Sequence, residues 1–463
     1  MLPKKAPPAP DPFIPKKGKT PALVRGMKDI LPADWPWWNM VIDKVHAIAR
    51  DFGFERIETP VLEENSMFVR SVGKETDIVE KELFSFLDRG GDNVAMRPEG
   101  TAGVARAYLE HGMMALPQPV KLYYVGPMFR YDRPQSGRYR QFWQCGFELF
   151  GDAHPVVDAE LIAIGATLFS ELGIPVRVQV NSVGDAASRT AYTKVLTDYF
   201  RTRKSRLCED CKRRLQKNPL RILDCKVPDC QLLTQDAPAM VDHLSEPARE
   251  HFVKTLEHLD DMDVAYDLNP RIVRGLDYYT HTAFEYVAAD GVGVDKAQSA
   301  LGGGGRYDGL VELFGGRPTP AMGFAAGIER TIMQLKVRGV QPPVPGRPDV
   351  FLAQLGDTAR RKSLKLFREL RGLGIRVAAT FSKTSIKAQL EAANRLRAPF
   401  TLILGQKELV DDTILIRDME SGIQEIVDFN KAVGEVQKRI LKTNGEKQLV
   451  NGVAPIETPT AES

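Results

Sequence analysis

The stretch that decides the fold is Lys121–Phe150, which reads KLYYVGPMFRYDRPQSGRYRQFWQCGFELF. Two runs rich in Tyr, Val, Phe and Trp flank a polar segment, 131–138, that contains Pro134 and Gly137. This pattern predicts a long antiparallel hairpin with an extended loop, because aromatic residues favour strands while Pro and Gly favour turns. The rest of the chain can be placed outward from this hairpin.

Alternate side chains of the second strand point to opposite faces of the sheet. Arg130, at the end of the first strand, adds a guanidinium suited to a phosphate or carboxylate. On the polar face, Gly146 leaves room for a ligand against the backbone, although a solvated sheet face fits the same pattern. The apolar face comprises Gln141, Trp143, Cys145, Phe147 and Leu149. The polar face comprises Arg140, Phe142, Gln144, Gly146 and Glu148.

The composition is that of a globular protein with two or three domains: 463 residues, 43% hydrophobic and 27% charged. The net charge of +3 means that any nucleic-acid surface must be local. No apolar run approaches the ~20 residues of a membrane span, and the N-terminus lacks the apolar segment of a secretory signal. Five cysteines in so long a chain indicate a reducing cytoplasm rather than a disulfide scaffold.

Several stretches mark the domain boundaries. Residues 1–20 hold six prolines, five lysines and one acidic residue, too little apolar content to fold. The four prolines of Val340–Pro348 indicate a linker, and alternating strands and helices follow it as an α/β module. We expect disorder again from about Gly445. The resulting divisions are 1–20 (tail), 21–340, 341–348 (linker), 349–430 and 431–463 (extension).

A helix and a strand precede the hairpin. Apolar residues at helical spacing predict a helix over Asp34–Phe52, with Asp34 as its N-cap. A strand is predicted over Phe54–Leu62, and Pro60 places it at a sheet edge or at an interface, because proline cannot donate to a ladder. Further on, Glu99 precedes a helix that begins near Thr101, so its carboxylate fits either a helix cap or a ligand ammonium.

Four cysteines lie in a basic segment. Residues 201–221 contain nine Lys or Arg against two acidic residues, which favours a phosphate backbone nearby. The cysteine spacing is C-x2-C, thirteen residues, then C-x4-C, which fits either a structural zinc site or a set of reduced thiols. The candidate ligands are Cys208, Cys211, Cys225 and Cys230.

Three motifs follow the basic segment. RGLDYYT (274–280) leads into a strand, and ALGGGGRYDGL (300–310) places four glycines where a backbone must pass close to a ligand or another chain segment. Gly323–Leu335 is predicted as a helix, on which small neighbours leave room for a flat ligand against the Arg330 guanidinium. In the C-terminal module, the basic first helix fits either a solvated face or an RNA contact.

Together these segments, from Arg25 to about Val427, resemble histidyl-tRNA synthetases, which are class II aminoacyl-tRNA synthetases. The helix with the Pro60 strand is similar to class motif 1, the hairpin to motif 2 and 323–330 to motif 3. RGLDYY and ALGGGGRYDGL are similar to the two peptides that mark the histidine-specific enzymes. Five such motifs in the family's order make the resemblance specific.

The resemblance implies an α+β fold: an antiparallel catalytic sheet carrying an insertion at about 186–268, followed by an α/β anticodon-binding domain. It also implies a homodimer formed through motif 1. The expected activity is ATP-dependent attachment of L-histidine to tRNA(His) through histidyl-adenylate, with Mg²⁺ on the outer phosphates of ATP. A zinc ion would be structural in this family.

Site residues carry over by position. The resemblance implies that Arg130 and Arg274 act at the α-phosphate and the carboxylate, and that Arg330 stacks on adenine. Arg138 is assigned to ATP, although Arg138 and Arg140 fit phosphates of either ATP or tRNA. It implies that Glu99, Thr101 and Gln144 hold the α-ammonium of histidine, and that Glu148 and Tyr279, with Tyr278 nearby, bind the imidazole. Arg133 and Gln135 would meet the tRNA acceptor end.

A non-catalytic alternative uses the same fold. Some synthetase-like proteins are regulatory subunits of ATP phosphoribosyltransferase in histidine biosynthesis, and these tend to lose the histidine-specific arginine and the C-terminal domain. Here Arg274 and the C-terminal module are both present, which favours the enzyme. A tRNA-binding protein without activity would explain the basic insertion but not the crowded pocket.

Overall fold

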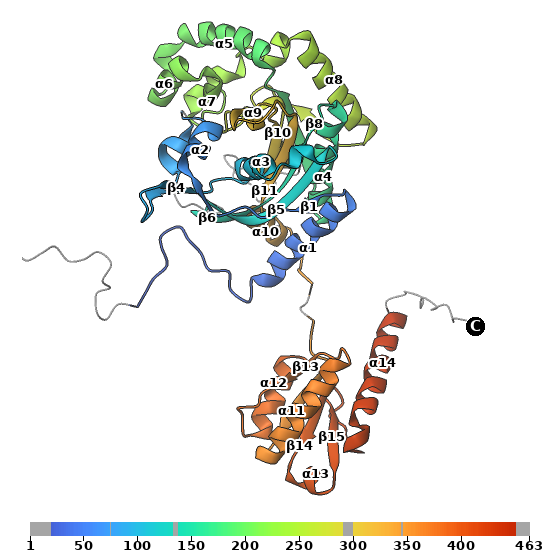
Figure 1. Cartoon of the computed structure of the whole chain (residues 1–463). Helices are drawn as coiled ribbons and strands as arrows, with labels where there is room; N and C mark the ends of the chain where they lie inside the picture. The colour runs from blue at the N-terminus through green and yellow to red at the C-terminus, as the bar shows by residue number, and fades with distance from the viewer. Residues whose placement is uncertain (1–19, 75, 133–137, 290–299, 344–345, 451–463) are drawn as a thin grey trace, which may run out of the picture. The chain divides into compact units, whose positions relative to one another are not determined.

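The computed structural model describes residues 20–74, 76–132, 138–289, 300–343 and 346–450 (Figure 1). The predicted N-terminal tail falls almost entirely outside the described residues, as do Arg133 and Gln135. The chain divides into two compact units, residues 1–343 and 344–463.

In the described part of the N-terminal unit, an eight-stranded sheet is antiparallel through its six central strands. The outer strands β1 and β8 run parallel to their neighbours. The predicted hairpin is confirmed: β5 and β6 pair antiparallel, with Tyr124 opposite Gly146. In order across the sheet, the strands are β1 (Glu55–Arg56), β5 (Val120–Phe129), β6 (Gln141–Phe150), β11 (Ala321–Gly327), β10 (Ala300–Arg306), β9 (Thr280–Ala288), β7 (Val176–Ser182) and β8 (Tyr266–Leu268).

The two faces of this sheet carry different layers. Cys145, Phe147 and Leu149 of β6 belong to one core with apolar side chains of several helices, which confirms the predicted apolar face. On the other face, Tyr124 belongs to a second core that includes Tyr108. The first face is covered by helices that include α1 (Trp35–Asp51), α4 (Pro155–Glu171) and α10 (Ile328–Val337), and the second face carries α3 (Thr101–Glu110).

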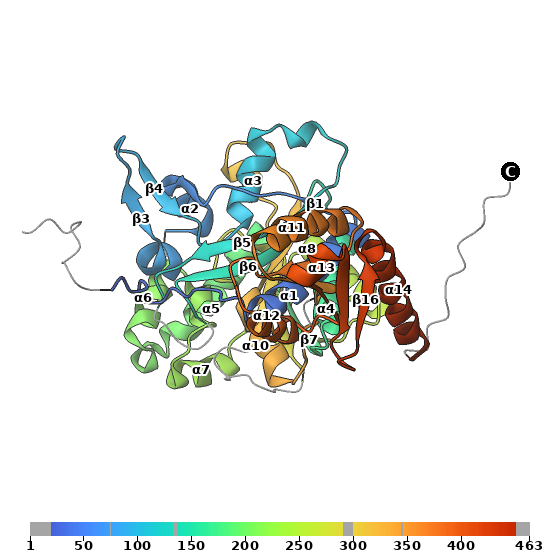
Figure 2. The same cartoon turned by 90° about the horizontal axis from the view of Figure 1, so that it is seen from below.

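The single strand predicted for Phe54–Leu62 is wrong. Its beginning forms β1 at the edge of the large sheet, whereas Leu62 starts β2 in a second, three-stranded sheet. Pro60 falls between the two sheets, where its missing N–H costs no ladder bond. The second sheet projects beside α2 (Figure 2). Its elements are β2 (Leu62–Glu64), β4 (Asn93–Met96), β3 (Ser85–Leu87) and α2 (Asn65–Val72).

The helix predicted for Gly323–Leu335 is also wrong in its first part. Residues through Gly327 belong to β11, which pairs with both β6 and β10, and the helix α10 begins at Ile328. Pairing on both sides outweighs the weak strand propensity of a run of Gly and Ala. Asp34 stands at the N-cap position of α1, but its carboxylate makes no capping hydrogen bond.

A buried ion pair joins the end of β10 to α4. The Arg306 guanidinium, 1% exposed, donates to Asp158 Oδ1 through Nε (2.9 Å) and Nη2 (2.5 Å). The second oxygen of Asp158 accepts from Thr282 Oγ1 at 2.6 Å and lies 2.8 Å from His251 Nε2. Burial alone would raise the pKa of Asp158, but the charges and hydrogen bonds of Arg306 and His251 together outweigh the effect of burial, and the pKa is lowered. Breaking such a pair costs about 3–5 kcal/mol, so α4 and β10 are firmly joined.

The segment predicted as an insertion leaves the sheet after β7 and is largely helical. Its helices α5, α6 and α7 gather on one side of the unit, away from α1 and α10 (Figure 1). Tyr192, Leu196 and Leu215 belong to the core that underlies the sheet, so the insertion is packed onto the unit. Its elements are α5 (Ala186–Arg201), α6 (Glu209–Lys217), the 3-10 turn η4 (Pro219–Ile222), α7 (Pro228–Gln235) and α8 (Glu246–Asp261).

The C-terminal unit is the predicted α/β module, with a five-stranded mixed sheet in its described part. The strands in spatial order and the helices are β13 (Val377–Ala379), β12 (Val350–Gln354), β14 (Phe400–Leu404), β15 (Thr413–Asp418), β16 (Gln424–Asp428), α11 (Asp357–Gly372), α12 (Ile386–Arg395), α13 (Gln406–Val410) and α14 (Ala432–Val450).

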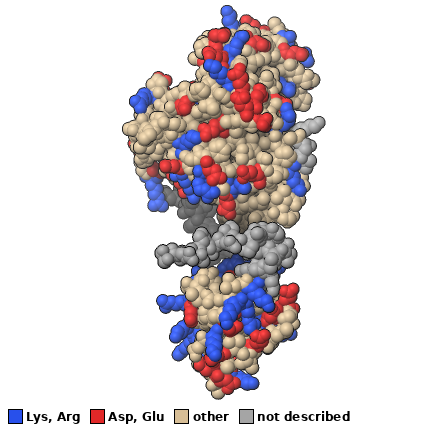
Figure 3. All heavy atoms as spheres, turned by 90° about the vertical axis from the view of Figure 1, so that its right-hand side faces the viewer, with Lys and Arg blue, Asp and Glu red and all other residues tan. Residues whose placement is uncertain are grey.

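The first helix of this unit has a basic exposed side. The exposed side of α11 carries Arg361, Lys365, Arg368 and Arg371, and basic side chains cluster on the visible face of the unit (Figure 3). The helix α14 continues to Val450, and the disorder predicted from about Gly445 stays a prediction. In the described part of the chain, no helix is both long enough and apolar enough to cross a bilayer.

Candidate active site

A fully buried carboxylate, Glu148, lies on the polar face of β6. Its Oε1 accepts from Thr101 Oγ1 (2.7 Å) and its Oε2 from the Tyr307 hydroxyl (2.5 Å). Gly323, opposite Glu148 in β11, makes the room, since a Cβ there would lie 1.8 Å from Glu148 Oε2. Burial raises the pKa of Glu148 to about 8, so this carboxyl can exchange a proton with a ligand near neutral pH.

Glu99 lies at the beginning of α3 and is 4% exposed. It accepts from the backbone N–H groups of Thr101 (2.7 Å) and Ala102 (2.9 Å), so the helix-cap interpretation is confirmed. The Tyr278 hydroxyl lies 3.4 Å from the same carboxylate, and burial raises the pKa of Glu99. A carboxylate has about four acceptor positions, so capping the helix leaves capacity for a ligand.

Tyr124 fills the space at Gly146 that the sequence assigned to a ligand. A Cβ at Gly146 would lie 2.3 Å from the Tyr124 ring, and one at Gly100 would lie 2.2 Å from it. Two residues before Gly146 on the same face, Gln144 Oε1 is buried without a hydrogen-bond partner among the described residues. An unpaired buried acceptor costs about 1–3 kcal/mol, so this oxygen is suited to a donor on a ligand.

A cluster of guanidiniums lies near one end of the same face. Arg330, in the first turn of α10, donates to the carbonyl oxygen of Ala300 at 2.9 Å. Burial, and then the charges of Arg138 and Arg130, lower the pKa of Arg330. Arg130 Nε donates to the carbonyl oxygen of Pro98 at 2.8 Å. Because like charges repel, a bound anion would stabilise this arrangement.

Arg274 belongs to the same region. Its Nη1 lies 2.9 Å from Glu285 Oε1, and the charge of Glu285 also acts on Arg330, opposing the fall in its pKa. The Arg274 guanidinium carbon lies 5.2 Å from the centroid of the Tyr279 ring. The absence of a side chain at Gly303 leaves room for the Arg274 guanidinium, because a Cβ at Gly303 would lie 2.8 Å from Arg274 Nη1. Arg274 Nε is buried without a hydrogen-bond partner in the described structure.

The predicted residues therefore fall into two adjoining groups. One joins carboxylates and phenols, with the Tyr278 and Tyr279 rings 4.7 Å apart and Tyr307 6.5 Å from Tyr279. The other joins guanidiniums, and Arg138 also pairs with Asp132 at 2.9 Å. The first group comprises Glu99, Thr101, Gln144, Glu148, Tyr278 and Tyr279. The second group comprises Arg130, Arg138, Arg274 and Arg330.

Sequence reasoning missed three residues of this site: Tyr124, Glu285 and Tyr307. The register of the hairpin pairs Tyr124 with Gly146, so the large residue opposite the glycine was a usable signal. Tyr307 stands directly after the glycine-rich strand, within ALGGGGRYDGL (300–310). No local pattern distinguishes Glu285 from an ordinary strand residue.

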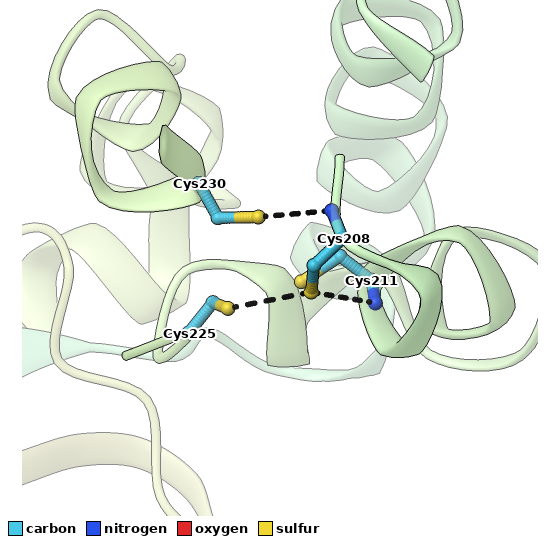
Figure 4. A group of neighbouring side chains, drawn as sticks. All are labelled: Cys208, Cys211, Cys225 and Cys230. Atoms are coloured by element: carbon cyan, nitrogen blue, oxygen red, sulfur yellow. Dashed lines mark hydrogen bonds between the residues drawn. The ribbon is translucent and has the colours of Figure 1, made fainter. Parts of the chain in front are cut away.

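The four insertion cysteines converge in space (Figure 4). One ligand atom from each can be chosen so that all lie within 4.8 Å of one another, and three of the residues are buried. The sulfurs of Cys208 and Cys225 are 3.9 Å apart, too far for a disulfide. Backbone N–H groups of Cys208 and Cys211 point at the sulfurs of Cys230 (3.3 Å) and Cys208 (3.4 Å). Four sulfurs about one centre suit a tetrahedral soft cation.

Comparisons with known proteins agree with this geometry. The family profile described as Histidyl-tRNA synthetase matches residues 26–331. The chain belongs to the histidyl-tRNA synthetase family. A second profile, described as Anticodon binding domain, matches residues 349–439. The chain therefore has the class II synthetase fold that its sequence predicts, with an antiparallel catalytic sheet and a C-terminal anticodon-binding domain.

Individual relatives are similar over nearly their whole length. The histidine–tRNA ligase of Dehalococcoides mccartyi strain 195 is 46% identical, covering 90% of this chain and 99% of the relative. That of Pelotomaculum thermopropionicum is 46% identical over 92% of this chain and 98% of its own. The apo histidyl-tRNA synthetase structure from S. aureus is 36% identical, with a TM-score of 0.76 over 90% of this chain and 100% of that chain.

The raised pKa of Glu148 predicts a specific pH dependence of stability. The unfolded chain ionises this carboxyl near its usual 4.5, whereas the folded protein keeps its proton to about 8. Between these values the folded state binds more protons, so Glu148 makes the free energy of unfolding fall as pH rises. Glu148→Gln should flatten that part of the curve, measured by urea unfolding between about pH 5 and pH 8.

The matched control is Glu257→Gln, which removes an exposed carboxylate from α8. This control should retain the wild-type pH dependence. Parallel curves for the wild type and Glu148→Gln would show that Glu148 ionises as an ordinary carboxyl group.

Proposed function

We propose that this protein attaches histidine to tRNA in two steps, with ATP, as its Mg²⁺ complex, and histidine as the first substrates. The observation that carries the proposal is the pairing of a guanidinium cluster with a pocket of buried carboxylates and phenols on one sheet face. Membership of the family, at 46% identity over 90% of the chain, supports it independently.

In the first step, the histidine carboxylate attacks the α-phosphorus of ATP. A bond forms between the carboxylate oxygen and that phosphorus, the bond to the bridging oxygen breaks, and pyrophosphate leaves. Both reactants are anionic, so catalysis requires fixed cations at the reaction centre. We assign Arg130 and Arg274 to the α-phosphate and the carboxylate, Arg138 to the other ATP phosphates, and Arg330 to the adenine, with Mg²⁺ neutralising the outer phosphates.

The carboxylates and phenols provide amino-acid selection. Glu148 and Tyr279 bind the two nitrogens of the imidazole, with Tyr307 and Tyr278 completing the wall. Glu99, Thr101 and the unpaired Gln144 oxygen receive the α-ammonium group. A side chain without two ring nitrogens would leave buried polar groups unpaired, which costs about 1–3 kcal/mol for each group.

In the second step, a hydroxyl of the terminal adenosine of tRNA attacks the acyl carbon, and AMP leaves. The C-terminal unit matches an anticodon-binding profile, and the exposed basic side of α11 suits a phosphate backbone. We assign Arg133 and Gln135, which lie outside the described residues, to the acceptor end. Recognition of tRNA(His) in particular is part of this proposal.

The regulatory-subunit alternative has less support. It predicts loss of the histidine-specific arginine and of the C-terminal domain, whereas Arg274 is present beside Glu285 and the C-terminal unit is folded. A protein that binds histidine for signalling alone would also have no need for the guanidinium cluster around Arg330.

We further infer that Cys208, Cys211, Cys225 and Cys230 hold one structural Zn²⁺. With Zn–S bonds of about 2.3 Å, a tetrahedral site places sulfurs roughly 3.8 Å apart, close to the 3.9 Å between Cys208 and Cys225. All five cysteines are free thiols in the structure, which suits a reducing compartment, and we propose the cytoplasm.

Metal analysis tests the zinc site. Protein purified without chelator should contain about one zinc per chain, and Cys211→Ser should lose most of it because three thiolates bind zinc more weakly. Cys145→Ser is the matched control: this fifth cysteine is also buried but lies in β6, so its removal should leave the zinc content unchanged. Zinc-free, well-folded wild type would identify the four cysteines as reduced thiols.

We also infer a homodimer formed through α1 and the segment around β1. In the described sheet, β1 is an outermost strand only two residues long, and Leu62 beyond it is 46% exposed. An edge of this kind is available to a partner. Sedimentation velocity should give twice the mass of one chain; a monomer at micromolar concentration would contradict the inference.

Histidine-dependent exchange of pyrophosphate into ATP tests the catalytic proposal. The purified protein should exchange radiolabelled pyrophosphate into ATP when histidine is added, and not with other amino acids. Arg274→Ala should fold normally but lower the exchange rate about 10²–10³-fold, because a fixed cation at the developing charge is lost. Arg271→Ala, an exposed arginine three residues earlier, should retain the wild-type rate.

Two outcomes would contradict the assignment. Well-folded wild type without histidine-dependent exchange would favour the regulatory alternative. Near-normal exchange by Arg274→Ala would remove Arg274 from the mechanism while leaving the overall function in place.

A further inference from the structure

The segment that carries Arg274, Tyr278 and Tyr279 has little structure of its own. Residues 271–279 form turns, bends and irregular backbone, with no helix or strand before β9 begins at Thr280. A side chain on such a segment is held in place only by the contacts that surround it. Those contacts therefore decide where the Arg274 guanidinium can lie.

Two side chains of the insertion bind this segment directly. Arg221, in η4, donates from Nη1 to the carbonyl oxygen of Arg274 at 3.0 Å. Asn218 donates from Nδ2 to Asp277 Oδ1 at 3.2 Å. The insertion thus forms hydrogen bonds with both ends of the stretch 274–277, which lies immediately before Tyr278 and Tyr279 of the pocket.

Arg221 is itself held in place from two sides. Its side chain is 10% exposed, and its Nη2 lies 3.9 Å from Asp77 Oδ2. Arg214 binds the same oxygen at 2.8 Å and also donates to the carbonyl oxygen of Arg221 at 3.3 Å. Asp77 belongs to the segment after α2, outside the insertion. We call Asp77, Arg214 and Arg221 the arginine clamp.

The cysteine cluster lies next to this clamp in the chain. Arg214 follows Cys211 by three residues on α6, and Arg221 precedes Cys225 by four. The Cys225 N–H donates to the carbonyl oxygen of Ile222 at 3.1 Å, which closes the turn between Arg221 and the cluster. A metal ion joining Cys211 to Cys225 would therefore fix the spacing of the two arginines.

We propose that Arg221 is a positioning residue for Arg274, and that the four-cysteine metal site sets the geometry of the clamp through which it acts. The proposal rests on the role of Arg274 in the proposed function. In this positioning role, the insertion contributes to adenylate formation without contacting ATP or histidine. Misplacing a charged group by about 1 Å is enough to cost as much as ~10² in rate, so a modest loosening of the segment has a measurable effect.

The first test measures the segment itself. Hydrogen–deuterium exchange of the ligand-free protein should be several-fold faster at residues 272–279 in Arg221→Met than in the wild type, while α4 stays protected. Asp77→Asn, which loosens the clamp from its other side and keeps every cysteine, should give the same pattern. Arg213→Met is the matched control, because Arg213 lies beside Arg214 on α6 but pairs with the exposed Asp210.

The second test measures catalysis with the same variants. Arg221→Met should lower kcat for histidine-dependent pyrophosphate exchange about 10- to 100-fold, with smaller changes in KM and a full zinc content. Cys225→Ser should lose zinc and show the same defect, and combining it with Arg221→Met should add little. Arg213→Met should behave as the wild type.

Each outcome decides a separate point. Unchanged hydrogen exchange at 272–279 in Arg221→Met and Asp77→Asn would overturn the clamp, whatever the activity. Faster hydrogen exchange at 272–279 together with a normal kcat for pyrophosphate exchange would overturn the positioning role toward Arg274. Arg221 would then be a structural contact only. Normal kcat in a folded, zinc-free Cys225→Ser would remove the metal site from the proposal. A wild type without histidine-dependent activity would contradict the proposed function instead, and the hydrogen-exchange comparison would still decide on the clamp.

Discussion

The structure depends on keeping one carboxylate, Glu148, away from water. Its two oxygens are bound by Thr101 at 2.7 Å and Tyr307 at 2.5 Å, and these donors come from α3 and from the end of β10. The hydrogen bonds offset part of the cost of burying the group. They also tie two segments, distant in the sequence, to a single point on β6. The neighbouring tyrosines and Glu99 take their places around that point, so the geometry of the pocket follows from a single buried group.

Much of this architecture could be predicted from the sequence because it is written in local patterns. The aromatic runs of β5 and β6, their alternation and the glycines of β10 each specify an element. The pocket residues Glu148 and Tyr279 come together because the motifs that contain them lie on β6 and just before β9. The C-terminal unit was predictable for the same reason, since strands and helices alternate in it with clear periodicity.

The remaining errors arise where partners distant in the sequence decide the structure. The stretch at Phe54–Leu62 looks like one strand, but it joins two different sheets, and only tertiary pairing separates β1 from β2. β11 contains small residues with weak strand propensity, and pairing with β6 and β10 makes it a strand. Glu285 owes its importance to Arg274, which no local pattern reveals. The space at Gly146 was predicted as a ligand contact, but Tyr124 occupies it.

The use of glycine around the pocket limits how its selectivity can be redesigned. Gly100 and Gly146 accommodate the ring of Tyr124, and Gly323 accommodates Glu148. No smaller amino acid exists, so a chamber for a bulkier non-natural substrate cannot be carved from these positions. A larger pocket would require a smaller side chain in place of Tyr124 or Tyr307. Replacing Tyr307 would also remove a hydrogen-bond donor from Glu148. Enlarging the chamber and preserving its polarity are therefore opposing aims at Tyr307, which leaves Tyr124 as the more accessible starting point for directed evolution.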